Sequence, residues 1–398
     1  MNHNGERRAL LLAPQFFYPA DGGDKLSCHA LRRSLSTLGF LVDVLCYGQT
    51  NSRPRPLENG TVFEVKKPRR VRPLKLFRSA ALGESYLFNR FVPGREVGRI
   101  IEKNCPWSDY EVIVVVHGYL ERLVPRHKLR PTAKVLISSE VLESKALLQK
   151  SVYAGRIAAA LLRLEAKRTE QKEFSTFASA DGTFFYSQDE LLWYRSRGGT
   201  NGQKVEFGLD MAAYRPSDRP RNYPYQIAFY GGFTWHPNSD ALAYLLGEVW
   251  PAIAALRSDV LLRIAGHAIP RWAFEKKCAN TQIVGPVEDI SAFISSSDVV
   301  LAPLRVGGGT RVKILEAMAL ARPVVATSVA LEGNGSEVGR DVLLADSPSE
   351  FAKQVNALLS SRARWSEIAQ NGRRFVELHH DLRVAITAPM SGWVRGIS

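Results

Sequence analysis

The sequence lacks long apolar runs: no stretch approaches the roughly 18 apolar residues that a membrane-spanning helix requires. Only four of its 398 residues are cysteines, and these form neither a CxxC pair nor a zinc-ligand spacing. Glycine and proline, at 30 and 21 residues, are too few for a collagen-like or disordered chain. We therefore expect a globular protein without a disulfide framework, in a reducing, cytoplasmic location.

Several common catalytic signatures are absent too. The loop after the first predicted strand has no Gly-x-Gly-x-x-Gly fingerprint of a nicotinamide site. No Ser–His–Asp set stands out, and no strand ends in a DxD-like pair of carboxylates that would bind a metal. We expect a reaction that needs neither a cofactor nor an essential metal.

Acidic residues are scarce relative to basic ones. The formal net charge is +14, and residues 1–210 hold 33 Lys or Arg against 22 Asp or Glu. The densest basic stretch contains no acid, which suggests an anionic partner such as a lipid surface, a lipid-linked phosphate or a nucleic acid. Its cations, which form the predicted membrane-facing patch, are Lys66, Lys67, Arg69, Arg70, Arg72, Lys75 and Arg78. The alternative is a solvated loop.

Short apolar runs alternate with helical patterns along the whole chain, which predicts parallel sheets covered by helices. One series of strands ends near residue 187, and a second begins near 226. The polar, proline-rich segment 214–225 between the two series is typical of a linker. We predict an α/β fold with two Rossmann-like domains, at 1–213 and 214–380. Residues 381–398 form a C-terminal helix, broken at Pro389, that packs back toward the first domain.

Ligands of open parallel sheets bind beyond the carboxyl ends of the strands. Gly22 and Gly23 follow the first strand and precede a helical pattern, where backbone N–H groups can meet a phosphate. The alternative for this pair is a tight turn. His117 ends another predicted strand, where it can hold a hydroxyl or act as an acid or base near neutral pH.

The most informative segment is residues 301–328, a strand followed by a glycine run and then a helix. Bare N–H groups, a helix dipole and two cations suit a diphosphate, and the carboxylate in the second turn can accept hydrogen bonds from ribose hydroxyls. The alternative is a flexible loop beside a surface ion pair. The predicted site residues here are Gly307, Gly308, Gly309, Thr310, Arg311, Lys313 and Glu316.

This segment resembles the nucleotide-sugar motif of retaining glycosyltransferases of family four. The FYGGFTWHPNSDAL stretch at 229–242, the RIAGHA and VGPVEDI stretches, and the VEFGLDMAAYRP segment before the linker also resemble that family in order and spacing. The resemblance is stronger over 226–350 than before 210. It implies the GT-B fold, in which two Rossmann-like domains face each other across a cleft. It also implies a UDP- or GDP-type sugar donor in the second domain and a saccharide or lipid-linked acceptor near the first. Transfer with retention and without an essential metal would follow.

The resemblance implies individual roles. Glu316 matches the second carboxylate of a paired-glutamate motif, whereas Gly308 stands where the first carboxylate is expected. His117 resembles a histidine near the donor sugar. Further binding positions by this resemblance are Gly22, Gly23, Gly232 and Val287.

Three other functions remain open from the sequence. A sugar-nucleotide epimerase would need extra carboxylates in the first domain, where Glu140 and Glu143 are the nearby acids. A nucleic-acid binder would explain the charge, but the basic stretch has one aromatic residue, Phe77, and hence no stacking platform. A non-catalytic protein that binds anionic ligands is the third.

Overall fold

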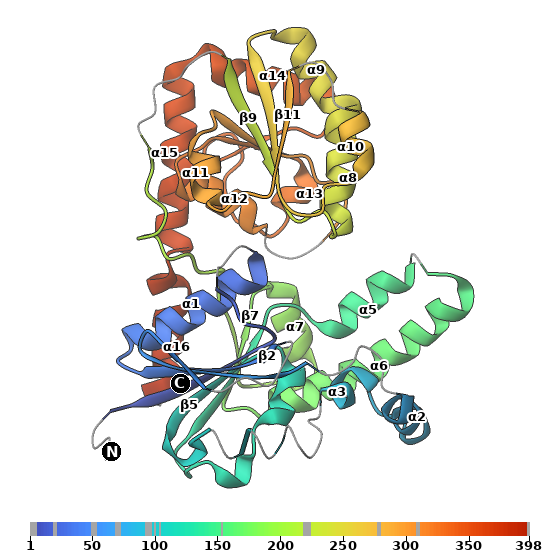
Figure 1. The fold of residues 1–398 in the computed structure, drawn as a ribbon, viewed down its shortest axis with the longest axis vertical. Coiled ribbons are helices and arrows are strands. Elements are labelled where there is room, and N and C mark those ends of the chain that lie inside the picture. Colours follow the sequence, from blue (N-terminus) through green and yellow to red (C-terminus); the bar gives the residue numbers. More distant parts are fainter. Residues whose placement is uncertain are drawn as a thin grey trace. The chain divides into compact units, whose positions relative to one another are not determined.

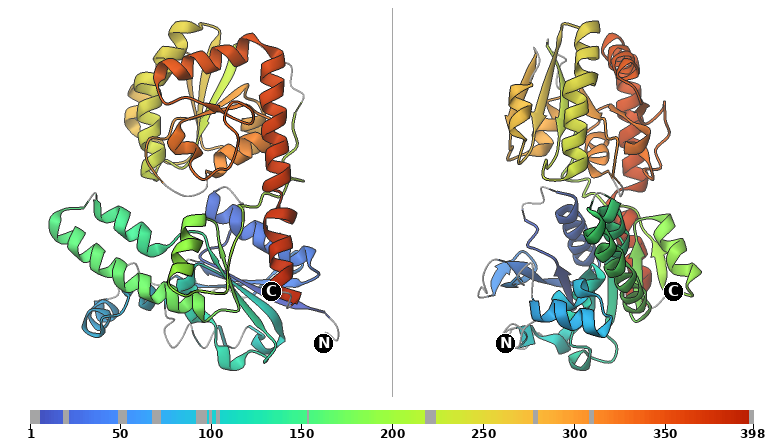
Figure 2. Two further views of the ribbon diagram at one scale, coloured as in Figure 1. Left: turned by 180° about the vertical axis from the view of Figure 1, so that it is seen from behind. Right: turned by 90° about the vertical axis from the view of Figure 1, so that its right-hand side faces the viewer.

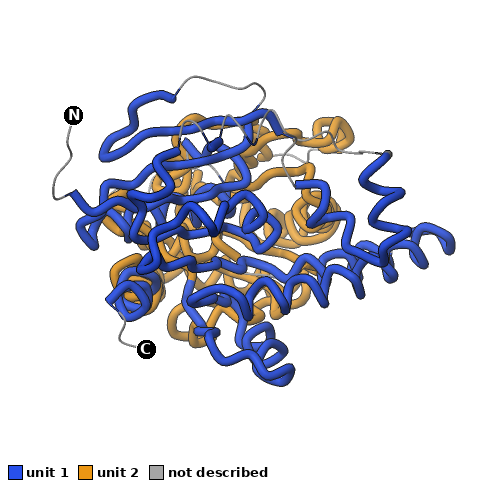
Figure 3. The backbone as a smooth tube through the Cα atoms, turned by 90° about the horizontal axis from the view of Figure 1, so that it is seen from below, with its two compact units in different colours: residues 1–206, 385–398 blue, residues 207–384 orange. Residues whose placement is uncertain are grey.

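The computed structural model describes residues 6–18, 22–48, 54–67, 73–91, 98, 101–102, 105–152, 154–217, 224–276, 280–307 and 311–395. The chain forms two compact units, unit 1 with residues 1–206 and 385–398, and unit 2 with residues 207–384 (Figure 3). These divisions lie after residues 206 and 384, whereas the sequence analysis placed them after 213 and 380.

Unit 1 contains an eight-stranded sheet in the order β3-β4-β2-β1-β5-β6-β7-β8, parallel except for β3 against β4. The sequence analysis missed β3, β4 and β8, which are short or lie toward the sheet edges. The strands are β1 (Arg8–Ala13), β2 (Leu41–Gly48), β3 (Arg55–Leu57), β4 (Gly60–Lys66), β5 (Tyr110–Val116), β6 (Lys134–Ser139), β7 (Gly182–Phe185) and β8 (Gly202–Lys204).

Both faces of this sheet are buried because alternate residues of each strand enter different cores. Leu11 packs in the core of α1 (Gly23–Thr37) and α16 (Ala388–Arg395), whereas Leu10 and Leu12 pack in the core of α3 (Tyr86–Arg90), α6 (Arg156–Ala178) and α7 (Gln188–Ser196). The π-helical turn Arg383–Thr387 leads directly into α16, so the predicted break at Pro389 is wrong. Pro389 is the second residue of α16, and the helix continues through it to Arg395.

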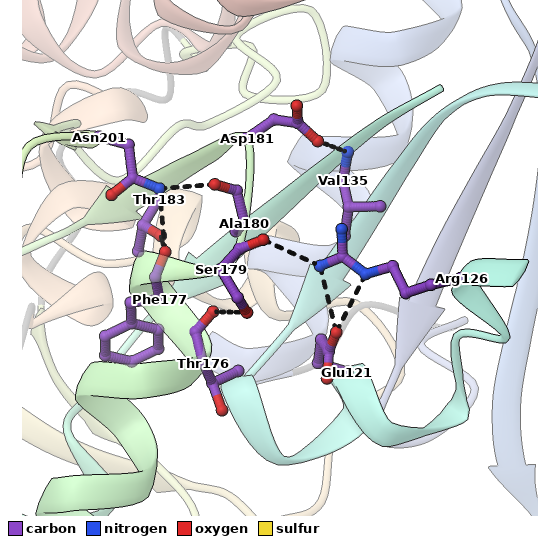
Figure 4. A network of polar contacts seen from close by, with 10 residues as sticks. All are labelled: Glu121, Arg126, Val135, Thr176, Phe177, Ser179, Ala180, Asp181, Thr183 and Asn201. Carbon is purple, nitrogen blue, oxygen red and sulfur yellow. Dashed lines mark hydrogen bonds and ion pairs between the residues drawn. The ribbon is translucent and has the colours of Figure 1, made fainter. Parts of the chain in front are cut away.

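The α5 helix (Glu143–Val152) and α6 form a helical hairpin that extends past the sheet of unit 1, with α2 (Pro73–Leu82) close by (Figure 1). A polar network fastens the carboxyl end of α6 to the sheet (Figure 4). Asn201 donates through Nδ2 to the carbonyls of Phe177 and Ala180, at 2.9 and 2.7 Å. Arg126 Nη2 donates to the carbonyl of Ser179 at 3.4 Å.

Unit 2 contains a six-stranded parallel sheet in the order β11-β10-β9-β12-β13-β14, with helices packed against it (Figure 2). Its strands are β9 (Tyr225–Tyr230), β10 (Val260–Ala265), β11 (Thr281–Gly285), β12 (Val299–Ala302), β13 (Val324–Ala326) and β14 (Leu343–Leu344). Its helices are α8 (His236–Tyr244), which a π-helical turn joins to α9 (Trp250–Leu256), α10 (Arg271–Glu275), α11 (Ile290–Ser295), α12 (Val312–Ala319), α13 (Ser328–Leu331), α14 (Pro348–Ser360) and α15 (Arg362–His379).

The predicted α/β class with two parallel sheets is confirmed. The cleft between the two domains stays a prediction. Each sheet reverses its strand order once, at the β1/β5 pair in unit 1 and at the β9/β12 pair in unit 2. Such reversals leave a crevice beyond the carboxyl ends of the two strands, where ligands of α/β proteins bind. Among the described residues, none of the helices combines the length and the apolar character needed to span a bilayer.

Candidate functional site

The strand reversal of unit 2 brings together the loops that follow β9 and β12. Gly232 lies exposed in the first loop, and Gly307 lies in the second. Gly307 has φ +113°, and a Cβ there would come 3.0 Å from Cγ of Pro237, at the start of α8. Only glycine adopts this backbone without strain while packing so closely. The predicted residues Gly308, Gly309 and Thr310 lie outside the described part of the chain.

The α12 helix begins at Val312 with Arg311 as its N-cap. Its apolar residues Ile314 and Leu315 are fully buried. The side chain of Arg311 is also buried, and its guanidinium lies 5.9 Å from the centre of the Trp235 ring. Burial lowers the pKa of Arg311 because desolvation disfavours the charged form.

Lys313 lies in the first turn of α12. Its Nζ donates to Oδ1 of Asn238 at 2.6 Å and lies 5.1 Å from the centre of the Phe229 ring. Burial, assisted by the positive charge of Arg311, lowers the pKa of Lys313 to about 7. An anionic ligand at this position would stabilise the charged ammonium, so the lysine is suited to bind phosphate.

Glu316 is buried and accepts a hydrogen bond from the hydroxyl of Tyr214 at 3.2 Å. Burial raises the pKa of Glu316 to about 7, against the effects of Tyr214 and of the positive charge of Lys313. The alternative that Glu316 forms a solvated surface ion pair with Lys313 is therefore wrong. The sequence analysis missed Tyr214 and Asn238 as partners, since no local pattern relates residues 102 and 75 positions apart.

The remaining predicted positions of unit 2 belong to the same edge of its sheet. Val287 is half-buried and follows β11, while Gly232 follows β9 and Gly307 follows β12. The carboxyl ends of parallel strands share one edge, so these loops converge on the region of Lys313 and Glu316.

The strand reversal of unit 1 places Gly22, Gly23 and His117 at one sheet edge. Gly22 is the N-cap of α1, and a Cβ there would meet nothing within 4 Å. The packing of the chain therefore does not require glycine at this position. His117 follows β5 with φ +64°, stacks on the Tyr119 ring at 5.3 Å and places Nδ1 3.6 Å from Oε1 of Glu143.

Two carboxyl groups accompany His117, and the sequence analysis gave them no role in binding. Glu140 follows β6, and burial raises its pKa to about 7 against the effect of His117. Glu143 opens α5, and burial raises its pKa as well. Within the described ranges, no three or more His, Cys, Asp or Glu side chains gather in a way that could hold a metal ion.

The predicted membrane-facing patch is only partly described. Arg69, Arg70 and Arg72 lie outside the described residues. Lys66 ends β4 and Lys67 follows it, whereas Lys75 and Arg78 belong to α2. All of the described members belong to unit 1.

Comparison with known proteins finds a family match within unit 2. Residues 224–361 match the family model described as glycosyl transferases, group 1. A curated relative from Klebsiella pneumoniae, an uncharacterized 44.6 kDa protein in a cps region, is 25% identical over 219 residues. That alignment covers 51% of this chain and 54% of the relative, so the chain spans about half the length of this curated relative.

Solved structures extend the likeness to the whole chain. Sucrose-phosphate synthase from Thermosynechococcus elongatus superposes with a TM-score of 0.69 at 16% identity, covering 98% of this chain and 99% of the other. Anabaena HepE in complex with UDP and glucose gives 0.65 at 12% identity, covering 98% and 100%. WaaG, a glycosyltransferase of lipopolysaccharide biosynthesis, gives 0.63 at 14% identity, again over 98% and 100%. Residues 224–361 thus match the group 1 glycosyl transferases, and the chain as a whole shares the GT-B fold of these solved structures.

Proposed function

We propose that the protein transfers a sugar from a nucleoside-diphosphate sugar to a saccharide or lipid-linked acceptor, with retention of the anomeric configuration. The observation that carries this proposal is the placement of the half-buried Lys313 and the buried Glu316 on α12, at the strand reversal of the unit that contains the family match. The complexes of HepE with UDP and with UDP-glucose support a UDP-type donor.

In this proposal, Glu316 accepts hydrogen bonds from the ribose hydroxyls while Lys313 and Arg311 face the diphosphate. Val287 and the loop before it hold the base. Gly232, the glycine run at 307–309 and Thr310 let the backbone approach the phosphates, and Gly22 and Gly23 do so from unit 1. In the absence of a carboxylate at position 308, backbone amides would meet the donor sugar.

The chemistry assigned to these residues is electrostatic. Negative charge develops on the diphosphate as the bond to the anomeric carbon breaks, and preorganised cations stabilise that charge. The leaving diphosphate takes the proton of the attacking hydroxyl on the same face of the sugar. His117 holds a hydroxyl of the donor sugar in this scheme, and its contact with Tyr119 fixes the plane of the ring.

The acceptor is assigned by class. The curated relative belongs to a cps region, which supports a polysaccharide or its lipid-linked precursor. The excess of cations in residues 1–210 supports an anionic surface next to unit 1. We place the protein in the cytoplasm, peripheral on the inner face of the membrane.

A thermal-shift panel with UDP, GDP, ADP and their sugars tests donor binding. A ligand at 100 times its Kd stabilises the native state by about 2.7 kcal/mol, so one nucleotide should raise Tm clearly above the others. If none of them raises Tm, the protein is not a nucleotide-sugar transferase.

An epimerase of the same fold is the second candidate, because Glu140 and Glu143 lie with His117 in unit 1. Product analysis separates the two functions. A transferase consumes donor only when an acceptor is present, whereas an epimerase converts the donor alone. A non-catalytic binding protein would show the thermal shift and form neither product.

Transfer should not depend on a divalent metal, because Arg311 and Lys313 already supply positive charge for the diphosphate. We expect EDTA to leave the initial rate unchanged. The measurement is product formation before and after chelation. A rate that disappears in EDTA and returns with manganese or magnesium would contradict the scheme.

A further inference from the structure

Unit 1 has a pocket of about 300 Å³ between the carboxyl end of α2 and the middle of α6. Three cationic side chains line it, from a 3-10 helix after β5 and from two successive turns of α6. The rest of the lining consists of two hydroxyl groups, one carboxylate, one side-chain amide, one aromatic ring and a glycine. The residues that matter here are Arg122, Arg168, Lys172, Ser85, Ser175 and Glu84.

The charge of this pocket is predominantly positive. Arg122, Arg168 and Lys172 form no ion pair with the described residues, and Arg168 makes one long hydrogen bond, from Nη2 to the carbonyl of Ala80 at 3.5 Å. The carboxylate of Glu84 already accepts a hydrogen bond from Nδ2 of Asn89 at 2.7 Å. Burial, followed by the charge of Arg122, lowers the pKa of Lys172, and the charges of Glu121 and Glu84 offset this only in part. The cations therefore repel one another and would be stabilised by an anion.

The adjoining helix α2 exposes apolar side chains to an unusual degree. Leu74 is 87% exposed, Phe77 77% and Leu82 57%, while Ser79 is buried. Lys75 and Arg78 alternate with these apolar residues. A helix that presents both cations and large apolar side chains to solvent is typical of segments that lie in a lipid interface.

The tip of the neighbouring α5–α6 hairpin has the same character. Val152 at the end of α5 is 73% exposed, and Ile157 at the start of α6 is 81% exposed. Arg168 of α6 contacts α2 directly, so the hairpin and α2 belong to one side of unit 1. Exposed apolar groups in this number, on two adjoining elements, indicate an interaction surface.

We propose that this side of unit 1 docks on an anionic phospholipid membrane, with Leu74 and Phe77 of α2 entering the interface and the pocket of Arg122, Arg168 and Lys172 taking a lipid phosphate. The inference deepens the membrane partner of the proposed function. The proposed docking site is no longer the predicted membrane-facing patch alone. It is a surface that combines a phosphate-binding pocket with exposed apolar side chains. A soluble phosphate would account for the pocket but not for the exposed side chains of α2.

Co-sedimentation of the full-length protein with vesicles tests the proposal. The parent should bind vesicles that contain phosphatidylglycerol and bind vesicles of phosphatidylcholine alone only weakly. The double variant Arg122→Ser/Lys172→Ser should lose about 25-fold in vesicle affinity, because each cation near an anionic surface contributes about 5-fold. The variant Leu74→Ser/Phe77→Ser should lose at least about tenfold.

Unit 2 offers matched controls for both changes. Arg362 and Arg364 of α15 are exposed, as are Leu256 at the end of α9 and Phe274 of α10. The variant Arg362→Ser/Arg364→Ser removes two positive charges, as the pocket variant does. The variant Leu256→Ser/Phe274→Ser removes one leucine and one phenylalanine, as the α2 variant does. Both controls should bind vesicles like the parent.

The outcomes separate the possible ligands. Parent-like vesicle binding by both test variants would overturn the proposal. If inorganic phosphate stabilises the parent but not the pocket variant, and both bind vesicles equally, the pocket serves a soluble phosphate and the lipid assignment is wrong. All variants should keep the thermal shift caused by UDP. If the parent itself lacks that shift, the proposed function fails independently of membrane docking.

Discussion

Replacing Glu316 by glutamine is expected to weaken UDP binding by about 10- to 150-fold. A hydrogen bond to a charged group contributes about 1.5–3 kcal/mol, and the glutamine loses the charge and one acceptor oxygen. The carboxyl already accepts a hydrogen bond from Tyr214, so the side chain is held in place before the ribose arrives. Titration calorimetry with UDP measures the effect.

The control for this variant must separate binding from stability, because Glu316 is buried. The exposed Glu367 of α15 offers a matched change, Glu367→Gln, which should leave UDP affinity unchanged. A 2′,3′-dideoxy nucleotide should bind the parent weakly and be almost indifferent to Glu316→Gln. If a folded Glu316→Gln protein binds UDP as tightly as the parent, Glu316 does not contact the ribose, and the site has to be centred on Arg311 and Lys313.

Replacing Lys313 by methionine is expected to lower kcat by about 100- to 1000-fold, the range seen when one preorganised group that stabilises developing charge is removed. Methionine keeps the length of the aliphatic stem but removes the ammonium, which lies 5.1 Å from the centre of the Phe229 ring. Rates of transfer at saturating donor measure the loss. Lys353→Met, on the exposed side of α14, is the matched control and should retain full activity.

The pH dependence of UDP affinity distinguishes a role of Lys313 in binding from a role in packing. The pKa of Lys313 is lowered to about 7 in the free protein, so the cation that binds a diphosphate is present below that pH and is lost as the pH rises through it. This loss should lower UDP affinity above about pH 7, against the opposite effect of Glu316, whose carboxyl ionises over the same range and can then accept ribose hydrogen bonds as a carboxylate. Lys313→Met should lack this decline, and a decline of equal size in both proteins would show that Lys313 does not bind the diphosphate.

Which strands could be predicted from the sequence depends on how their apolar residues are distributed. Central strands such as β5 and β12 are continuous apolar runs because both sheet faces are buried, and such runs are visible without a structure. The missed strands β8 and β11 lie at sheet edges, where half-exposed residues break the run. The glycine run and the cations before Glu316 were visible because they form one local segment.

The sequence by itself thus determined the α/β class, the presence of two sheets and the segment that carries Arg311, Lys313 and Glu316. The tertiary structure alone decided the strand order, because pairing of β1 with β5 or of β9 with β12 depends on contacts between distant segments. It also decided that Glu316 is buried against Tyr214 and Lys313 against Asn238. The periodicity and spacing of residue types indicate only how residues that are close together in the sequence are arranged. Desolvation, and with it the shifted pKa values of Lys313 and Glu316, arises only when remote segments close around the same side chains.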